Sequence, residues 1–112
     1  AGTAHGFITI FNPLTGVVRT APPIRTPRSG FAATVFAGQI VVAGGENFAP
    51  LETTNTAEYY SPENGEWRSL PNIPSAVHGV SAVSFNGRVY LMPGSISTGG
   101  VNNPGQIQIF SP

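Results

Sequence analysis

Apolar residues along this chain gather in short runs that glycine or proline interrupts. No uninterrupted window is long enough to show the 3.6-residue period of an amphipathic helix. Two pairs of runs are each separated by a two-residue turn, Ala37-Gly38 in one pair and Asn86-Gly87 in the other. A type I′ turn needs positive φ at both central residues, and Asn-Gly is strongly preferred there. The pattern therefore predicts two tight β-hairpins, with strands at residues 31–36 and 39–43 and at residues 80–85 and 88–92.

A third and a fourth strand are expected beyond the first hairpin. The third is predicted at residues 56–60, after a long polar loop that follows Gly44-Gly45, and the fourth at residues 66–70. Residues 61–65, which include Pro, Asn and Gly, form the turn between them. The same two-strand pattern is present at residues 7–11 and 17–20, and its third strand returns at residues 106–110. The whole chain is thus predicted to be all-β.

These segments form an internal repeat. Phe11-Asn12-Pro13 recurs 49 residues later as Tyr60-Ser61-Pro62 and, after a further 50 residues, as Phe110-Ser111-Pro112. A period near 50 residues is typical of a propeller blade or a solenoid unit. Four antiparallel strands within each period favour the propeller. A unit of this kind buries its apolar faces only against its neighbours.

The most regular copy of the repeat resembles one family. Its second strand ends in a glycine doublet, its third in a pair of aromatics, and a Pro-x-x-Gly turn precedes a Trp. In chain order these residues are Gly44-Gly45, Tyr59-Tyr60, Trp67 and Leu70-Pro71. Together they resemble the kelch repeat, although the next copy has Pro93 in place of the first Gly. The resemblance implies kelch-type β-propeller blades of four antiparallel strands each, with the aromatics in the core.

The chain is too short to close a ring of such blades. Residues 1–27 are predicted to be strands three and four of one blade, residues 28–75 one complete blade, and residues 76–112 strands one to three of the next. Propellers close with about four to eight blades, so this is an incomplete ring. We favour the carboxyl-terminal part of a longer propeller, whose earlier blades lie outside this sequence or on another chain. The alternative is a ring made of copies of the chain, in which the repeated third strand would be redundant.

Composition narrows the functional classes. Charged residues make up only 9% of the 112 residues, and five Arg balance five Glu to a net charge of zero. No basic field is available to attract phosphate backbones, which disfavours nucleic-acid binding. The lack of Cys excludes disulfides, thiolate metal sites and cysteine nucleophiles. No apolar run reaches the roughly 18 residues of a membrane span. The polar, weakly charged composition leans toward a secreted protein.

Candidate binding residues lie in the loops that open on one rim of the predicted ring, because rigid scaffolds place functional variation in loops. They are Arg28, Ser29, Glu46, Asn47, His78, Ser95 and Asn102. Kelch proteins that bind acidic peptides place Arg where Arg28 stands, but bonding to loop carbonyls is the interpretation we favour for it. His78 aligns with Ser29 and is either a ligand or acid–base residue or a structural hydrogen-bonding group. We predict no catalytic residue, metal site or cofactor.

Three functions fit this sequence. The first is a non-catalytic binding scaffold that holds a protein, peptide or glycan through its rim. The second is part of a kelch-like propeller enzyme, such as a sugar epimerase or a galactose-oxidase-like protein. The oxidase chemistry needs a Cys-modified Tyr, which a chain without Cys does not supply. The third is a self-assembling structural propeller. We predict the first of these functions, the non-catalytic binding scaffold.

Overall fold

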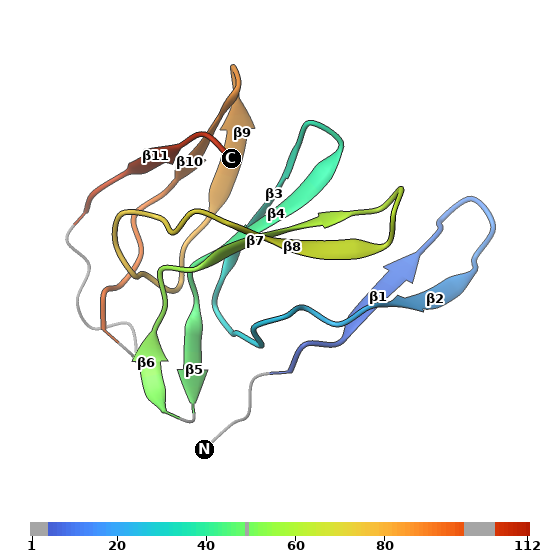
Figure 1. Ribbon diagram of the computed structural model, residues 1–112, viewed down its shortest axis with the longest axis horizontal. Coiled ribbons are helices and arrows are strands. Elements are labelled where there is room, and N and C mark those ends of the chain that lie inside the picture. The colour runs from blue at the N-terminus through green and yellow to red at the C-terminus, as the bar shows by residue number, and fades with distance from the viewer. Residues whose placement is uncertain (1–4, 49, 98–104) are drawn as a thin grey trace.

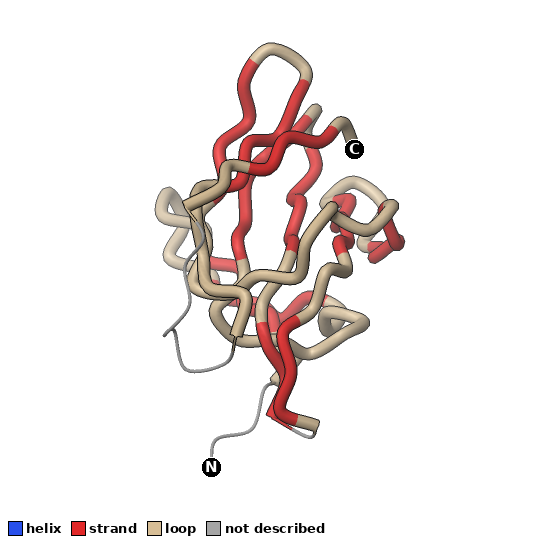
Figure 2. The backbone as a smooth tube through the Cα atoms, turned by 90° about the vertical axis from the view of Figure 1, so that its left-hand side faces the viewer, coloured by secondary structure: helices blue, strands red, loops and turns tan. Residues whose placement is uncertain are grey.

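Every regular element in the described residues 5–48, 50–97 and 105–112 is a β-strand in the computed structural model (Figure 1). Figure 2 shows the chain from the side, with strands in red joined by tan loops and no helix in the described part. The all-β prediction is confirmed. The strands are β1 (Ile8–Phe11), β2 (Val18–Ala21), β3 (Ala32–Phe36), β4 (Gln39–Ala43), β5 (Glu46–Phe48), β6 (Leu51–Thr53), β7 (Ala57–Ser61), β8 (Glu66–Leu70), β9 (Ala82–Phe85), β10 (Arg88–Leu91) and β11 (Gln108–Phe110).

The central sheet contains β3, β4, β7 and β8 in that order, and all neighbours are antiparallel. Its register is continuous, since Val41 of β4 lies opposite Thr34 of β3 and Tyr59 of β7. This is the predicted blade of four antiparallel strands. The predicted type I′ turns are present in both hairpins, where Ala37 and Asn86 have φ of 50° and 51° and each following Gly has φ of 77°.

Partial versions of this sheet lie on either side of it (Figure 1). Within the described residues β1 pairs only with β2, although its sequence equivalent β7 pairs with both β4 and β8. β11, β10 and β9 form a three-stranded sheet in that order. Each flanking sheet thus holds part of the four-strand pattern, and the three sheets form an incomplete ring.

The main apolar core lies between the central sheet and the β9–β10–β11 sheet. Burial of apolar surface drives this packing of sheet against sheet. Phe36, Leu70 and Phe110 pack against the cluster from its margin. The fully enclosed members of the cluster are Ala32, Ala43, Ala57, Ile73, Val77, Val80, Val89 and Leu91.

Two apolar sheet faces remain uncovered. On the central sheet, Phe31 and Ile40 line a cleft of about 460 Å³ between β3–β4 and the β1–β2 hairpin. On the last sheet, Val83 and Phe85 of β9 are exposed, Phe85 by 70%. A soluble monomer rarely exposes contiguous apolar patches of more than a few hundred Å². The two faces indicate that each end of this set of sheets needs another sheet beside it.

The long loop expected after the glycine doublet is not irregular. It contains a short hairpin, in which Glu46 of β5 pairs with Thr53 of β6. Backbone bonds at its base hold it, since the amide of Thr54 donates to the Gly45 carbonyl at 2.9 Å. Figure 1 shows this hairpin extending away from the three larger sheets. The loop prediction was therefore wrong at this point.

The glycine doublet allows two backbone segments to approach closely. Gly44 has φ of 69°, and a Cβ on it would lie 2.5 Å from the Val77 carbonyl oxygen. The amide of Gly45 donates to that same oxygen at 2.7 Å. A residue with a side chain would separate the two segments, so the doublet joins the central sheet to the connection that leads into β9. Among the described residues no helix is long and apolar enough to cross a membrane.

Candidate functional site

Four of the predicted site residues meet at one end of the sheets, where the chain enters β3 and β9. The backbones of Ser29 and Glu46 exchange two hydrogen bonds, of 3.0 and 2.8 Å. The backbones of His78 and Ser95 do the same in the next repeat, at 2.9 and 2.8 Å. These isolated bridges occupy equivalent positions, 49 residues apart on the entering segment. The structure thus brings together residues that the sequence singled out separately.

His78 connects the two bridges through its side chain. Its Nε2 lies 2.5 Å from the Ser97 carbonyl oxygen, and its Nδ1 lies 3.6 Å from Glu46 Oε1. The His78 and Glu46 side chains are only 9% and 14% exposed. Because a carbonyl oxygen can only accept, the proton of a neutral His78 ring must be on Nε2. His78 therefore contacts loops of two successive repeats at once.

Two buried polar atoms flank this imidazole without a hydrogen-bond partner. They are Glu46 Oε2 and Ser97 Oγ, the unsatisfied buried side-chain atoms found in the described part of the chain. Most buried polar atoms in proteins are hydrogen-bonded, so each exception needs an explanation. Leaving a charged group unsatisfied costs more than leaving a neutral one. The cluster of Glu46, His78 and Ser97, here called the rim cluster, thus leaves one carboxylate oxygen and one serine hydroxyl unpaired.

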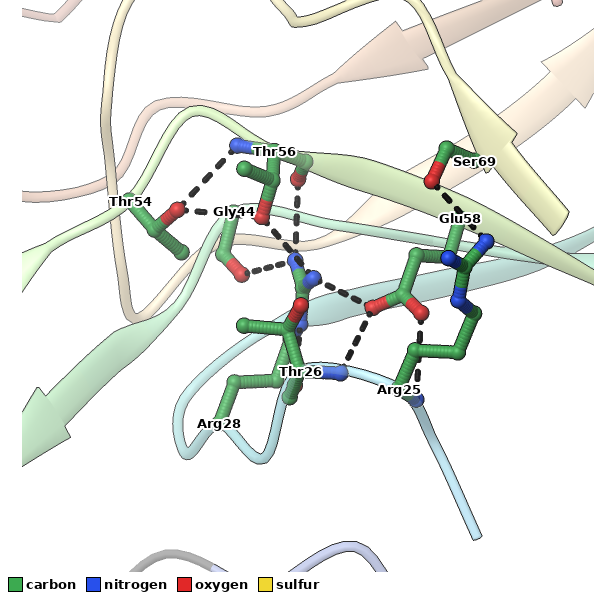
Figure 3. Close-up of polar contacts among 8 residues, drawn as sticks. All are labelled: Arg25, Thr26, Arg28, Gly44, Thr54, Thr56, Glu58 and Ser69. Atoms are coloured by element: carbon green, nitrogen blue, oxygen red, sulfur yellow. Dashed lines mark hydrogen bonds and ion pairs between the residues drawn. The ribbon is translucent and has the colours of Figure 1, made fainter. Parts of the chain in front are cut away.

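Arg28 lies beside these loops but faces the interior. Its side chain is 0% exposed, and its five N–H groups make five contacts (Figure 3). The shortest is the ion pair with Glu58, with 2.6 Å between the guanidinium NH2 and Oε2. The other acceptors are the carbonyls of Thr26, Gly44 and Thr56 and the Thr56 hydroxyl. No N–H remains for a ligand carboxylate, so the geometry fits the loop-bonding interpretation of Arg28.

Burial and pairing act in opposite directions on the charge of Arg28. Burial lowers the pKa of Arg28, whereas the negative charge of Glu58 and its hydrogen bond raise it. The ordinary pKa of Arg is so high that the guanidinium stays protonated. A buried, protonated Arg needs its counter-ion, which makes Glu58 indispensable to Arg28.

Sequence reasoning missed Glu58. Its Oε1 accepts from the Arg25 amide at 3.1 Å and its Oε2 from the Thr26 amide at 3.3 Å, so it also anchors the segment that leads into β3 (Figure 3). A signal was present, because the repeat replaces Glu58 by Gln108 and Arg28 by Val77. Both partners of the ion pair are thus exchanged for neutral residues in the same copy.

Gln108 keeps the anchoring role without the charge. Its Oε1 accepts from the Ser75 amide at 2.8 Å and its Nε2 donates to the Ser75 carbonyl at 3.2 Å. Ser75 is the repeat equivalent of Thr26. The polar residue near the start of the third strand therefore fixes the entering segment in both copies.

The remaining predicted residues fall outside the rim cluster. Asn47 lies on β5, half-buried and opposite Glu52. Asn102 lies outside the described residues. Ser95 is buried, and its hydroxyl donates to the Ser97 carbonyl at 2.8 Å. In the described segments, no group of three or more His, Asp or Glu side chains is placed to hold a metal ion.

Antiparallel sheets of a repeated four-strand pattern, packed side by side through shared cores, define a β-propeller, here as an incomplete ring. The kelch motif matches residues 27–74. The chain belongs to the kelch-repeat family.

Comparisons with known proteins agree with this assignment. The chain is 28% identical over 102 residues to an F-box/kelch-repeat protein of Arabidopsis thaliana, with 91% of this chain and 26% of that protein covered. It is 32% identical over 91 residues to Kelch-like protein 40 of Xenopus tropicalis, with 81% and 14% covered. The solved structure of YjhT superimposes with a TM-score of 0.67 at 20% identity, covering 72% of this chain and 25% of that one. This chain therefore spans about a quarter or less of each of these proteins.

Proposed function

We propose that this chain is part of a kelch β-propeller that binds a protein partner through the rim containing Ser29, Glu46, His78 and Ser95. The observation that carries the proposal is the joining of loops from two successive repeats into one surface. Thr53 of β6 donates its hydroxyl to the Ile96 carbonyl at 3.1 Å, and His78 lies between Glu46 and Ser97. A surface held by a rigid scaffold on both sides suits recognition, because little conformational entropy is lost on binding.

The exposed apolar side chains on these loops support a protein partner. Leu51 on β6 is 60% exposed and Ile96 is 43% exposed. They lie on the two loops that the Thr53–Ile96 bond holds together. Apolar side chains within a polar rim are the usual composition of a protein-recognition surface. Kelch repeats in general mediate protein–protein interaction, and the family assignment supports the same class of function.

The rest of the ring belongs to this proposal. Residues 28–75 form the complete blade, and residues 1–27 and 76–112 form parts of its two neighbours. The strands that complete these neighbours, and a further sheet beside β9, come from outside this chain and cover the apolar faces around Ile40 and Phe85. The rim loops of several blades then surround the mouth of a central channel.

A displayed library of random 16-residue peptides, panned against the immobilised chain, tests the proposal. Enriched peptides are measured against a rim variant, Leu51→Ser with Ile96→Ser, and a matched face variant, Val83→Ser with Phe85→Ser. We expect the rim variant to weaken binding about tenfold or more, as loss of apolar anchors does at interfaces. The face variant should bind as the wild type does. If no enriched peptide is sensitive to the rim variant, the rim is not the binding surface.

A further inference from the structure

We propose that the rim cluster of Glu46, His78 and Ser97 receives a positively charged side chain, Lys or Arg, from the bound partner. This inference rests on the proposed function and specifies the chemistry of its partner. It comes from the carboxylate at this place: Glu46 Oε2 is a buried acceptor that no group of the described chain satisfies.

The first acceptor is the Glu46 carboxylate. Its Oε2 is buried and has no hydrogen-bond partner. Its Oε1 has as its neighbour the His78 Nδ1, at 3.6 Å, which is beyond hydrogen-bonding distance. Neither oxygen therefore has a donor of ordinary geometry, and a carboxylate gains most from donors that carry a positive charge.

The second acceptor is the His78 ring in its neutral form. Its Nε2 donates to the Ser97 carbonyl at 2.5 Å, so a neutral ring presents the lone pair of Nδ1 toward Glu46. Two acceptors that face each other repel unless a donor lies between or beside them. An ammonium or guanidinium group has several N–H donors and satisfies both.

The third feature is the sign of the charges available at this rim. Arg28 has no free N–H, and the NH1 of Arg25 donates to Ser69 Oγ on β8, the outermost strand of the central sheet. Glu46 remains, with Glu52 exposed on β6 of the same hairpin. Among the described residues no Arg pairs with Glu46, so the rim cluster presents a carboxylate.

The flanking surface fits a long cationic side chain. Leu51 and Ile96 are exposed on the two loops that meet beside the cluster. Lys and Arg lay their aliphatic stems along apolar surface while the charged end reaches a polar partner. Glu46 Oε2 itself is covered, but the Glu46 side chain is 14% exposed, so the entering group approaches the carboxylate from that open part.

A double-mutant cycle on the enriched rim-binding peptides tests this inference. Each peptide is resynthesised with acetyl-lysine for Lys or citrulline for Arg, and affinities are measured for the wild type and Glu46→Gln. We expect charge removal to weaken binding to the wild type about tenfold or more, since hydrogen bonds between charged groups are the strong ones. Binding to Glu46→Gln should be weak for both forms and differ between them by about twofold or less. Glu63→Gln, in the exposed turn after β7, is the matched control and should behave as the wild type does.

Further measurements distinguish the loss of this contact from a folding defect. Glu46 pairs with Ser29 through its backbone, so Glu46→Gln should keep its Tm. In the wild type, the ¹⁵N resonance of His78 Nδ1 should shift when a Lys peptide is added, but not with its acetyl-lysine form. The inference is overturned if removing the peptide charge weakens binding equally for the wild type and Glu46→Gln. It is also overturned if peptides that bind the rim contain no Lys or Arg. In both cases rim binding, and with it the proposed function, would stand.

Discussion

At the scale of the residue, the buried Arg28–Glu58 pair is the clearest dependence between two positions. Breaking a buried ion pair by removing one partner typically costs about 3–5 kcal/mol, because the other charge is left unpaired. The next repeat has Val77 and Gln108 at the equivalent positions and keeps its anchor to Ser75. The two residues of the pair are therefore expected to depend on each other rather than to act separately.

We predict that Glu58→Gln destabilises the wild type by about 3 kcal/mol, through the unpaired guanidinium. The same change in an Arg28→Val background should cost about 1 kcal/mol or less, since the charge that needs Glu58 has gone. Urea unfolding of the four proteins in the cycle measures both values. If Glu58→Gln costs the same free energy of unfolding in both backgrounds, the charge pair does not couple Arg28 to Glu58.

The sequence could predict part of the candidate site but not its chemistry. It placed Ser29, Glu46, His78 and Ser95 on loops of one rim, because their positions follow from the repeat. It could not show that the Arg28 side chain points inward, because that orientation depends on Glu58, 30 residues away. The unsatisfied oxygen of Glu46 likewise depends on contacts between two repeats, which no local pattern contains.

At the scale of the element, local patterns were sufficient for most strands. The hairpins β3–β4 and β9–β10 follow from alternating runs around two-residue turns, and β7 and β8 from the repeat. The β5–β6 hairpin was missed because its strands have three residues each. Its pairing is imposed from outside, by the backbone bonds of Glu46 to Ser29 and of Thr54 to Gly45 at its base.

The two type I′ turns allow a reciprocal prediction. Ala37 has φ of 50° and Asn86 has φ of 51°, but a left-handed conformation costs Ala about 1–2 kcal/mol and Asn less. Ala37→Asn should therefore raise the free energy of unfolding by about 0.5–1 kcal/mol, and Asn86→Ala should lower it by a similar amount. Thermal unfolding of the two variants measures both. Changes of the same sign would mean that turn conformation does not control the stability of these hairpins.

At the scale of the whole molecule, the main feature is the two uncovered apolar sheet faces. The cleft beside Ile40 lies between the central sheet and β1–β2, and the exposed side chains of Val83 and Phe85 lie on the far side of β9–β10–β11. Between them, the covered interface of the central sheet with β9–β10–β11 shows how such faces are buried. The hydrophobic effect favours contact between any two apolar surfaces of this size in water. We therefore predict that the chain by itself does not remain a monomer.

Sedimentation velocity of the 112-residue chain over a range of concentrations measures this association. We expect species heavier than the 11.6 kDa monomer, whose share grows with concentration. Val83→Ser with Phe85→Ser should reduce this association, whereas the rim variant Leu51→Ser with Ile96→Ser should not. A single monomeric species at every concentration, with the sheet content intact by circular dichroism, would contradict the claim that each sheet needs a neighbour on both sides.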